Sequence, residues 1–333
     1  MTEQELALIY EAQKPALLAW GNMVKDAVLS RLTTTLAADR KLSEFLKIPP
    51  EPRVKDTDSF LAKALRRRKN YDRPLEQITD MVGIRFIVLL LTELSIIGDI
   101  IENCEIWDAE KARDFEAEKT ERPHHFDYQS IHYVVHPKKP VKSGDVITVP
   151  ASLMCEIQVR TLLQHAYAEL AHNTIYKPSL CLDRDVNRQI AKSSALVEAT
   201  DEIFIGVHGK IQAASEQLKR IHEIVAASYQ KHVGTPLNSD ERLTSSLLDP
   251  YRHNLRTLSA EALEVYLTEK DFIADRVKER APLSILYRHP VVLAVYFLVA
   301  NEPDLVPKQW PADQAHLEMI YSDLGISAEG RLW

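Results

Sequence analysis

Glycine and cysteine are scarce in this chain of 333 residues. Only 9 residues are glycine, whereas globular proteins average about 7%. Because glycine supplies most left-handed turns, this low content predicts a helix-rich fold with few such turns. The three cysteines, Cys104, Cys155 and Cys181, are odd in number and never form a C-x-x-C motif. Their pattern argues against a disulfide framework and a zinc ribbon and suits a reducing, cytoplasmic compartment.

Long apolar runs and an excess of basic charge are missing as well. The longest apolar runs, 86–91 and 290–300, are shorter than the roughly 18–20 residues of a membrane span. The first residues are acidic and amphipathic, without the basic-then-apolar order of a secretory signal. With 41 Lys and Arg against 48 Asp and Glu, the net charge of −7 is poor evidence for a general nucleic-acid binder, but it leaves room for a local basic pocket. We therefore expect a soluble cytoplasmic protein with no membrane partner.

The length corresponds to two domains at about 150 residues each. Hydrophobic residues at 45% and charged residues at 27% are ordinary globular values. Residues 232–246 concentrate Gly, Pro, Asn and Ser and are the best linker candidate. We place a first domain at 1–235, containing N-terminal helices and a long helix at 185–226. A small, all-helical accessory or regulatory domain follows at 236–333.

The alternation of short β-like and helical segments predicts that the first domain is a mixed β-sheet flanked by helices, an α+β or α/β arrangement. Thr2 and Glu5 have the spacing of a helix-capping box. Pro15 interrupts the helical pattern that follows, so the first 45 or so residues are predicted to be a broken helical pair. The expected strands are 53–55, 83–91, 130–135 and 153–161, and the helices between them are 59–69 and 94–101.

The long helix carries an apolar residue every seven positions. Such a stripe fits a coiled-coil seam between copies, a homo-oligomer built through helices, or a helix packed on its own domain. Gly206 and Gly209 favour packing on its own domain, because each glycine costs up to about 1 kcal/mol inside a helix. The stripe consists of Ile190, Val197, Phe204, Ile211, Leu218 and Val225.

Polar side chains alternate along all four predicted strands of the sheet. Alternate side chains of a strand share one face, so this spacing predicts a polar concave surface on the sheet. Fixed cations suit polyphosphate oxygens, and the separated carboxylates of Asp80 and Glu156 suit Mg²⁺. No Walker loop or G-x-G-x-x-G motif occurs, so side chains would hold the phosphates. The strand residues are Arg53, Lys55, Arg85, Tyr128, Ser130, His132, Glu156, Gln158 and Arg160.

A competing constellation is a possible zinc site at His165, Glu169 and His172, which share one helical face. The spacing is not H-E-x-x-H, and no cysteine cluster supports it. Spaced histidines on an amphipathic helix are more often hydrogen-bonded core residues. Serine hydrolase chemistry is weaker still, because no G-x-S-x-G motif is present.

Four segments in order carry a family resemblance. They are RVKDTDSFLAK (53–63), DMVGIR (80–85), YQSIH (128–132) and CEIQVRTLLQHAYAELAHNTIYK (155–177). The sequence at these positions resembles the synthetase domain of the RelA/SpoT family, the nucleotide pyrophosphokinases that make guanosine alarmones in the stringent response. The chain looks like a small, synthetase-only member. The resemblance implies transfer of the β,γ-diphosphate of ATP to the 3′-hydroxyl of GDP or GTP, with AMP as co-product and Mg²⁺ as cofactor.

The resemblance also implies an ATP site. Arg53 and Arg85 would sandwich the adenine. Lys55 and Lys63 would hold the phosphates, with support from Ser59.

On the acceptor side, the resemblance implies that Asp80 holds Mg²⁺. Glu156 would be a second metal ligand, or the base for the attacking hydroxyl. Tyr128 would stack on the base of the acceptor nucleotide, near His132 and Gln158.

Two departures from the family leave the acceptor open. Asp127 and Gln129 stand where family alarmone synthetases usually have glycine and a basic residue. Basic side chains do lie just upstream, within 119–125. A toxin-type relative that pyrophosphorylates the 3′ CCA end of tRNA, restrained by an antitoxin-like C-terminal domain and used in phage defence, is the alternative. A third, more distant alternative is an inactive nucleotide-binding module. The charged residues that the family uses are all retained, which argues against this alternative. They are Asp80, Glu156, Arg53, Lys55 and Arg85.

The C-terminal domain has an apolar face of its own. We expect this face mainly to close the domain's own core. A remaining patch would bind a regulatory partner, or dock on the first domain as a lid over the acceptor. The face consists of Leu283, Leu286, Tyr287, Val291 and Val292.

Overall fold

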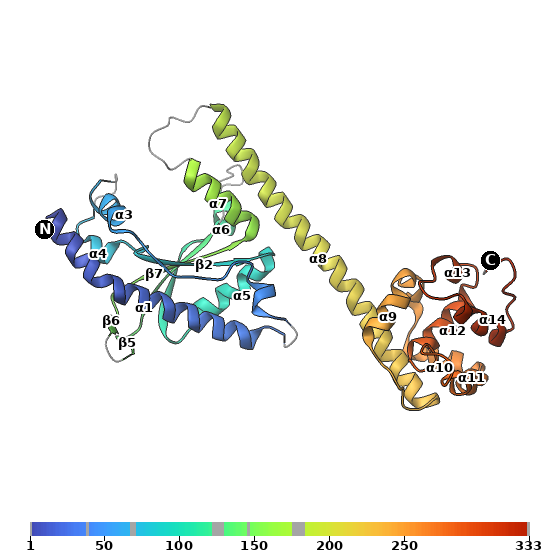
Figure 1. Cartoon of the computed structure of the whole chain (residues 1–333). Coiled ribbons are helices and arrows are strands. Elements are labelled where there is room, and N and C mark those ends of the chain that lie inside the picture. Colours follow the sequence, from blue (N-terminus) through green and yellow to red (C-terminus); the bar gives the residue numbers. More distant parts are fainter. Residues whose placement is uncertain are drawn as a thin grey trace. The chain divides into compact units, whose positions relative to one another are not determined.

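The computed structural model describes residues 2–37, 40–66, 71–121, 130–144, 147–174 and 184–331. The chain forms two compact units, Met1–Gly206 and Val207–Trp333, and helix α8 (Arg184–His232) belongs to both (Figure 1). None of the described helices combines the length and the apolarity that crossing a bilayer requires.

A mixed sheet organises the first unit, as predicted, and it has five strands where the sequence predicted four. Strands β2 and β7 run parallel, and the other neighbouring strands are antiparallel. A separate two-stranded hairpin pairs β5 (Val141–Ser143) with β6 (Ile147–Val149). In spatial order the sheet consists of β1 (Arg53–Val54), β2 (Val82–Val88), β7 (Cys155–Thr161), β4 (Ile131–Pro137) and β3 (Trp107–Arg113).

One face of this sheet is apolar and is covered by helices α1 (Glu3–Thr35) and α5 (Leu91–Glu102) (Figure 1). Ile84, Ile157 and Tyr133 are in register on neighbouring strands and belong to the core beneath these helices. Helix α1 contributes a buried row at helical spacing, namely Leu17, Trp20, Val24, Val28 and Leu32.

The predicted break at Pro15 is wrong, because α1 continues through this residue without interruption. An interior proline typically costs about 3 kcal/mol or more. The apolar row that follows Pro15 is buried against the sheet, and each fully buried large side chain contributes about 1.5–3 kcal/mol. Tertiary packing therefore outweighs the local preference. The capping box at Thr2 and Glu5 is confirmed by both of its hydrogen bonds.

The other face of the sheet is polar and carries shorter helical segments. Helix α7 (Leu162–Thr174) follows β7 directly and starts with a second capping box, in which Thr161 and Gln164 bond each other's backbone N–H. The hydroxyl of Thr161 also donates to buried Asp201 of α8, 2.8 Å away. The remaining segments of this unit are α2 (Leu42–Phe45), α3 (Thr57–Leu61), a π-helical turn (Ala62–Arg66), α4 (Pro74–Gln77) and α6 (Phe115–Glu121).

The second unit is all-helical and is built around α12 (Val291–Asn301), which is buried on nearly every side. The last turns of α8 pack into this same core through Leu218, Ile221, Val225 and Tyr229. For this reason the units divide at 206/207, inside α8, and not at 235/236 where the sequence pattern placed the boundary. The other helices are α9 (Glu241–Leu248), α10 (Ala260–Glu269), α11 (Phe272–Arg280), α13 (Val306–Gln309) and α14 (Ala315–Leu324), with 3₁₀ turns at Asp249–Tyr251 and Asn254–Thr257.

Most of the predicted apolar face of the second unit lies inside its own core. Leu286, Tyr287, Val291 and Val292 are all buried there, whereas Leu283 is 79% exposed. Closing the unit's own core therefore accounts for four of the five residues.

Candidate active site

The strand register brings the predicted polar residues into rows across the sheet. Arg85 of β2 pairs with Gln158 of β7, which in turn pairs with His132 of β4. In the next row on the same face, Gly83 pairs with Glu156. Alternate side chains of a strand share a face, so these side chains lie on the polar face, opposite α1 and α5.

A cluster of two lysines and one carboxylate lies at the β1–β2 edge of this face. Lys55 and Lys63 each place Nζ 2.9 Å from a carboxylate oxygen of Asp80. Lys55 follows β1, Lys63 lies in the π-helical turn, and Asp80 precedes β2. The three side chains are between 22% and 25% exposed, so solvent screens them only in part. We call these residues the Lys55–Asp80–Lys63 cluster.

The cluster carries a net positive charge. Burial raises the pKa of Asp80, but the charges and hydrogen bonds of Lys55 and Lys63 outweigh burial and hold this pKa below its usual value. Asp80 is therefore ionised at neutral pH and balances only one of the two lysines. An uncompensated ammonium group in a partly buried site attracts anions such as phosphate.

A second hydrogen-bonded group lies on β7 and β4. Glu156 accepts from His132 Nδ1 at 2.6 Å and from Gln158 Nε2 at 3.0 Å. Burial raises the pKa of Glu156, but the contacts with His132 and Gln158 lower it by more than burial raises it. The pKa of Glu156 therefore lies below its usual value. Asp80 raises this pKa slightly, which shows that the two carboxylates influence each other.

Arg85 is held from two elements. Its Nη1 lies 2.9 Å from Glu169 of α7, and its Nε donates to Gln158 at 3.3 Å. Glu169, a candidate zinc ligand by sequence, is thus paired with an arginine. Burial, followed by the charges of Arg160 and Arg85, lowers the pKa of His165 on the same helix.

No group of three or more possible metal ligands occurs among the residues that the structure describes. The side chain of His172 lies outside those residues. The contact between Glu169 and Arg85 was missed in the sequence, although one signal was available: Glu169 follows His165 by four positions, on the helix turn that faces the sheet.

Two further predicted ATP residues lie at the open edge of the face. Arg53 in β1 is 78% exposed and comes no closer than 3.6 Å to Asp56. Ser59 is exposed on α3. Tyr128, the predicted stacking residue, lies outside the described residues, as does the whole segment 122–129.

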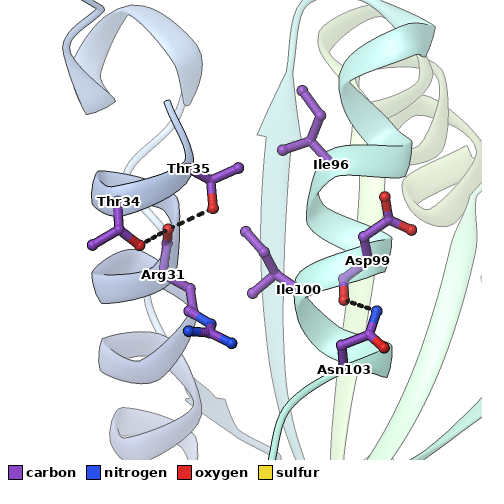
Figure 2. Close-up of a pocket in the computed structure, with 7 residues that line it drawn as sticks. All are labelled: Arg31, Thr34, Thr35, Ile96, Asp99, Ile100 and Asn103. Carbon is purple, nitrogen blue, oxygen red and sulfur yellow. Dashed lines mark hydrogen bonds between the residues drawn. The ribbon is translucent and has the colours of Figure 1, made fainter. Parts of the chain in front are cut away.

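A pocket of about 290 Å³ lies elsewhere, between the end of α1 and α5 (Figure 2). Thr34 and Thr35 donate to the carbonyl of Arg31, and Asn103 donates to the carbonyl of Asp99. These polar groups are satisfied by their own helices. Because α1 and α5 cover the apolar face of the sheet, the pocket is separate from the charged rows.

A family model matches the part of the chain that carries these residues. Residues 52–180 match the family described as "Region found in RelA / SpoT proteins". The GTP pyrophosphokinase YjbM of Bacillus subtilis (strain 168) is 27% identical over 169 residues, covering 50% of this chain and 75% of that protein. The GTP pyrophosphokinase YwaC of the same organism is 22% identical over 161 residues, covering 48% and 72%.

Solved structures similar to this chain include the small alarmone synthetase 1 from Bacillus subtilis bound to its product pppGpp, at 22% identity and a TM-score of 0.49. That match covers 63% of this chain and 99% of the synthetase. All ten residues predicted for the ATP, metal and acceptor sites fall within the family match at 52–180. The chain carries the region found in RelA/SpoT proteins, which confirms the resemblance drawn from its motifs.

Proposed function

We propose that the chain is an ATP-dependent pyrophosphokinase that transfers the β,γ-diphosphate of ATP to the 3′-hydroxyl of GDP or GTP. The observation that carries the proposal is the Lys55–Asp80–Lys63 cluster, on the sheet face that also holds Glu156 and His132. Similarity to proteins named GTP pyrophosphokinase supports it.

The reaction needs charge neutralisation and alignment more than covalent catalysis. The 3′-hydroxyl of the acceptor attacks the β-phosphorus of ATP and loses its proton to solvent. The bond between the β-phosphorus and the oxygen that bridges the α- and β-phosphates breaks, and AMP leaves with that oxygen. Lys55 and Lys63 would bind the transferred phosphates and offset the charge that builds up there.

The ATP base would lie between the guanidinium groups of Arg53 and Arg85. Stacking of a planar guanidinium on a base needs a fixed orientation, and the contacts of Arg85 with Glu169 and Gln158 provide one. Ser59, exposed on α3 four residues before Lys63, would add a hydroxyl to the phosphate site.

The donor set fits Mg²⁺ that arrives with ATP. Mg²⁺ is usually held by one or two carboxylates plus substrate phosphates, and Asp80 and Glu156 are two carboxylates with lowered pKa values. When bound, the ion would neutralise charge on the transferred diphosphate. The lowered pKa of Glu156 supports a role as metal ligand over a role as base, because a weakly basic carboxylate accepts a proton poorly at neutral pH.

The acceptor would lie toward β4. Tyr128 would stack on its base, and His132 and Gln158 would contact it. Asp127 and Gln129 favour the second candidate, transfer to the 3′ CCA end of tRNA, because they remove positive charge expected beside the 5′-phosphates of a free guanosine nucleotide.

The test is incubation of the full chain with γ-labelled ATP and, in separate reactions, GDP, GTP, ATP or bulk tRNA. We expect label on GDP and GTP. Label on tRNA alone would replace the first candidate by the second. No labelled acceptor in any reaction would refute both. Asp80→Asn should abolish transfer, and the matched control Asp99→Asn, beside the α1–α5 pocket, should not.

A further inference from the structure

The hydroxyl of Tyr10, on helix α1, reaches the backbone next to the Lys55–Asp80–Lys63 cluster. It donates to the carbonyl oxygen of Lys55 at 2.7 Å and lies 3.5 Å from the carbonyl oxygen of Met81, the residue after Asp80. Tyr10 is fully buried, and its ring stacks on Phe60 of α3, with 4.0 Å between ring centroids and 8° between planes. One side chain thus contacts the residue after β1, the residue before β2 and helix α3.

These contacts meet at the point where β1 turns into α3. The peptide that joins Lys55 to Asp56 is this turn, since Asp56 is the N-cap residue of α3. The N–H of Lys55 donates to Met81 at 2.9 Å, and the carbonyl of Lys55 accepts from Tyr10. Both backbone polar groups of Lys55 are therefore bonded, the N–H to Met81, which follows Asp80, and the carbonyl to Tyr10 of α1.

The ring of Tyr10 fixes the other side of the cluster. Phe60 lies on the helical segment that leads, three residues later, to Lys63. A second contact is a hydrogen bond from the hydroxyl of Thr57, at the start of α3, to the carboxylate of Glu11, the neighbour of Tyr10. Helix α1 itself is held on the sheet by its buried apolar row, so it is a rigid support for these contacts.

We infer that Tyr10 is a positioning residue for ATP binding, acting through the backbone of Lys55. This inference rests on the proposed function and deepens it, because it assigns to α1 a part in the phosphate site. Ammonium groups stabilise transferred phosphates only when they are held at fixed positions, and small displacements weaken them. The hydroxyl of Tyr10 sets the position of the Lys55 backbone, from which the ammonium group reaches the phosphates.

The experiment compares full-length wild type, Tyr10→Phe and a control, Tyr133→Phe. The substitution at Tyr10 keeps the stacked ring and removes only the hydroxyl. Tyr133 is equally buried in the same unit, but its hydroxyl bonds Glu102 on the apolar side of the sheet. Binding of a non-hydrolysable ATP analogue, the KM values for both substrates, kcat and the thermal midpoint are measured for each.

We expect Tyr10→Phe to weaken ATP-analogue binding and to raise the KM for ATP about fivefold to tenfold, the effect of one lost hydrogen bond. The acceptor KM should stay within about twofold, because the proposed acceptor site lies toward β4, away from Lys55. Tyr133→Phe should leave ATP binding unchanged, even if its thermal midpoint falls as much as that of Tyr10→Phe. In a Lys55→Ala background, Tyr10→Phe should have no further effect on ATP binding, because the group it positions is gone.

The inference is overturned if Tyr10→Phe binds the analogue as wild type does, if Tyr133→Phe weakens binding equally, or if the effect persists in Lys55→Ala. Wild type that binds no ATP analogue refutes the proposed function and the inference with it. Wild type that binds the analogue and transfers label, beside an unaffected Tyr10→Phe, refutes the inference alone.

Discussion

Two charged clusters, one in each unit, differ in how far their carboxylates are exposed. In the second unit, Asp323 is only 3% exposed and accepts from Arg280 at 2.6 Å and from Tyr296. In the first unit, Lys55, Lys63 and Arg85 are paired with carboxylates that remain partly exposed. A network around a buried carboxylate stabilises the fold, whereas partly exposed pairs can exchange a protein carboxylate for a substrate phosphate. Charge removal should therefore reduce turnover in the first unit and stability in the second.

The largest effect is expected at the two carboxylates of the first unit. Asp80→Asn or Glu156→Gln should lower kcat about 10²–10³-fold or more, because each removes a fixed charge from the transition-state environment. The near-isosteric exchanges should change stability much less. Single-turnover rates, with denaturant unfolding of the same preparations, measure both. Full turnover in either variant would remove that residue from the site.

The corresponding experiment in the second unit is Asp323→Asn, which removes the charge of the buried carboxylate. Losing a buried charge partner of Arg280 should destabilise this unit by about 3–5 kcal/mol. Turnover per folded molecule should stay unchanged. Urea unfolding followed by circular dichroism, together with the label-transfer assay, checks the contrast. A stable but inactive variant would mean that the second unit takes part in the chemistry.

Acid should also weaken the second unit through His289. Its Nε2 faces the carbonyl of Asp240 and its Nδ1 accepts from the N–H of Val291, so the neutral ring is fully bonded. Burial lowers the pKa of His289 below 6.5, nearby His222 adds to this, and contacts with Asp240 oppose it. The folded unit therefore prefers the neutral ring. This stability is present above pH 6.5 and is lost as the pH falls below that value.

The thermal midpoint of wild type at pH 7.5 and pH 5.5 tests this dependence, since one pKa unit corresponds to about 1.4 kcal/mol. The variant His289→Gln should have a lower midpoint at pH 7.5 and a flatter pH profile. An equally steep profile in that variant would assign the acid sensitivity to other groups.

The smallest effect is expected at Glu169. Glu169→Gln should raise the KM for ATP only about twofold to fivefold, because the pair with Arg85 is nearly half exposed and such pairs contribute about 0–1 kcal/mol. Glu279→Gln is the matched control, since Glu279 forms an exposed pair with Arg276 at 2.8 Å in the second unit. Equal ATP kinetics in both variants would show that Glu169 does not orient Arg85.

The sequence predicted those parts of the fold that local patterns encode. The period-two spacing of β4 and β7 identified the polar face correctly, and the described part of 236–333 is helical as predicted. Strand β3 was missed, because an edge strand with one partner and a single buried residue, Trp107, reads as a polar segment.

Contacts between distant segments were beyond the reach of pattern analysis. The pairing of Arg85 with Glu169 joins residues 84 positions apart, and the bond from Tyr10 to Lys55 spans 45. Each depends on how a helix crosses the sheet, which no local spacing encodes. The continuity of α1 through Pro15 has the same origin, since packing on the sheet decides it.

The most direct test of the account follows the α-phosphate. Wild type is incubated with α-labelled ATP and GDP, and the labelled products are separated and quantified against the diphosphorylated acceptor. The account predicts labelled AMP in a one-to-one ratio with that acceptor, and neither product with Asp80→Asn. Labelled ADP in place of AMP, or AMP formed without an acceptor product, would contradict diphosphate transfer at the charged face of the first unit.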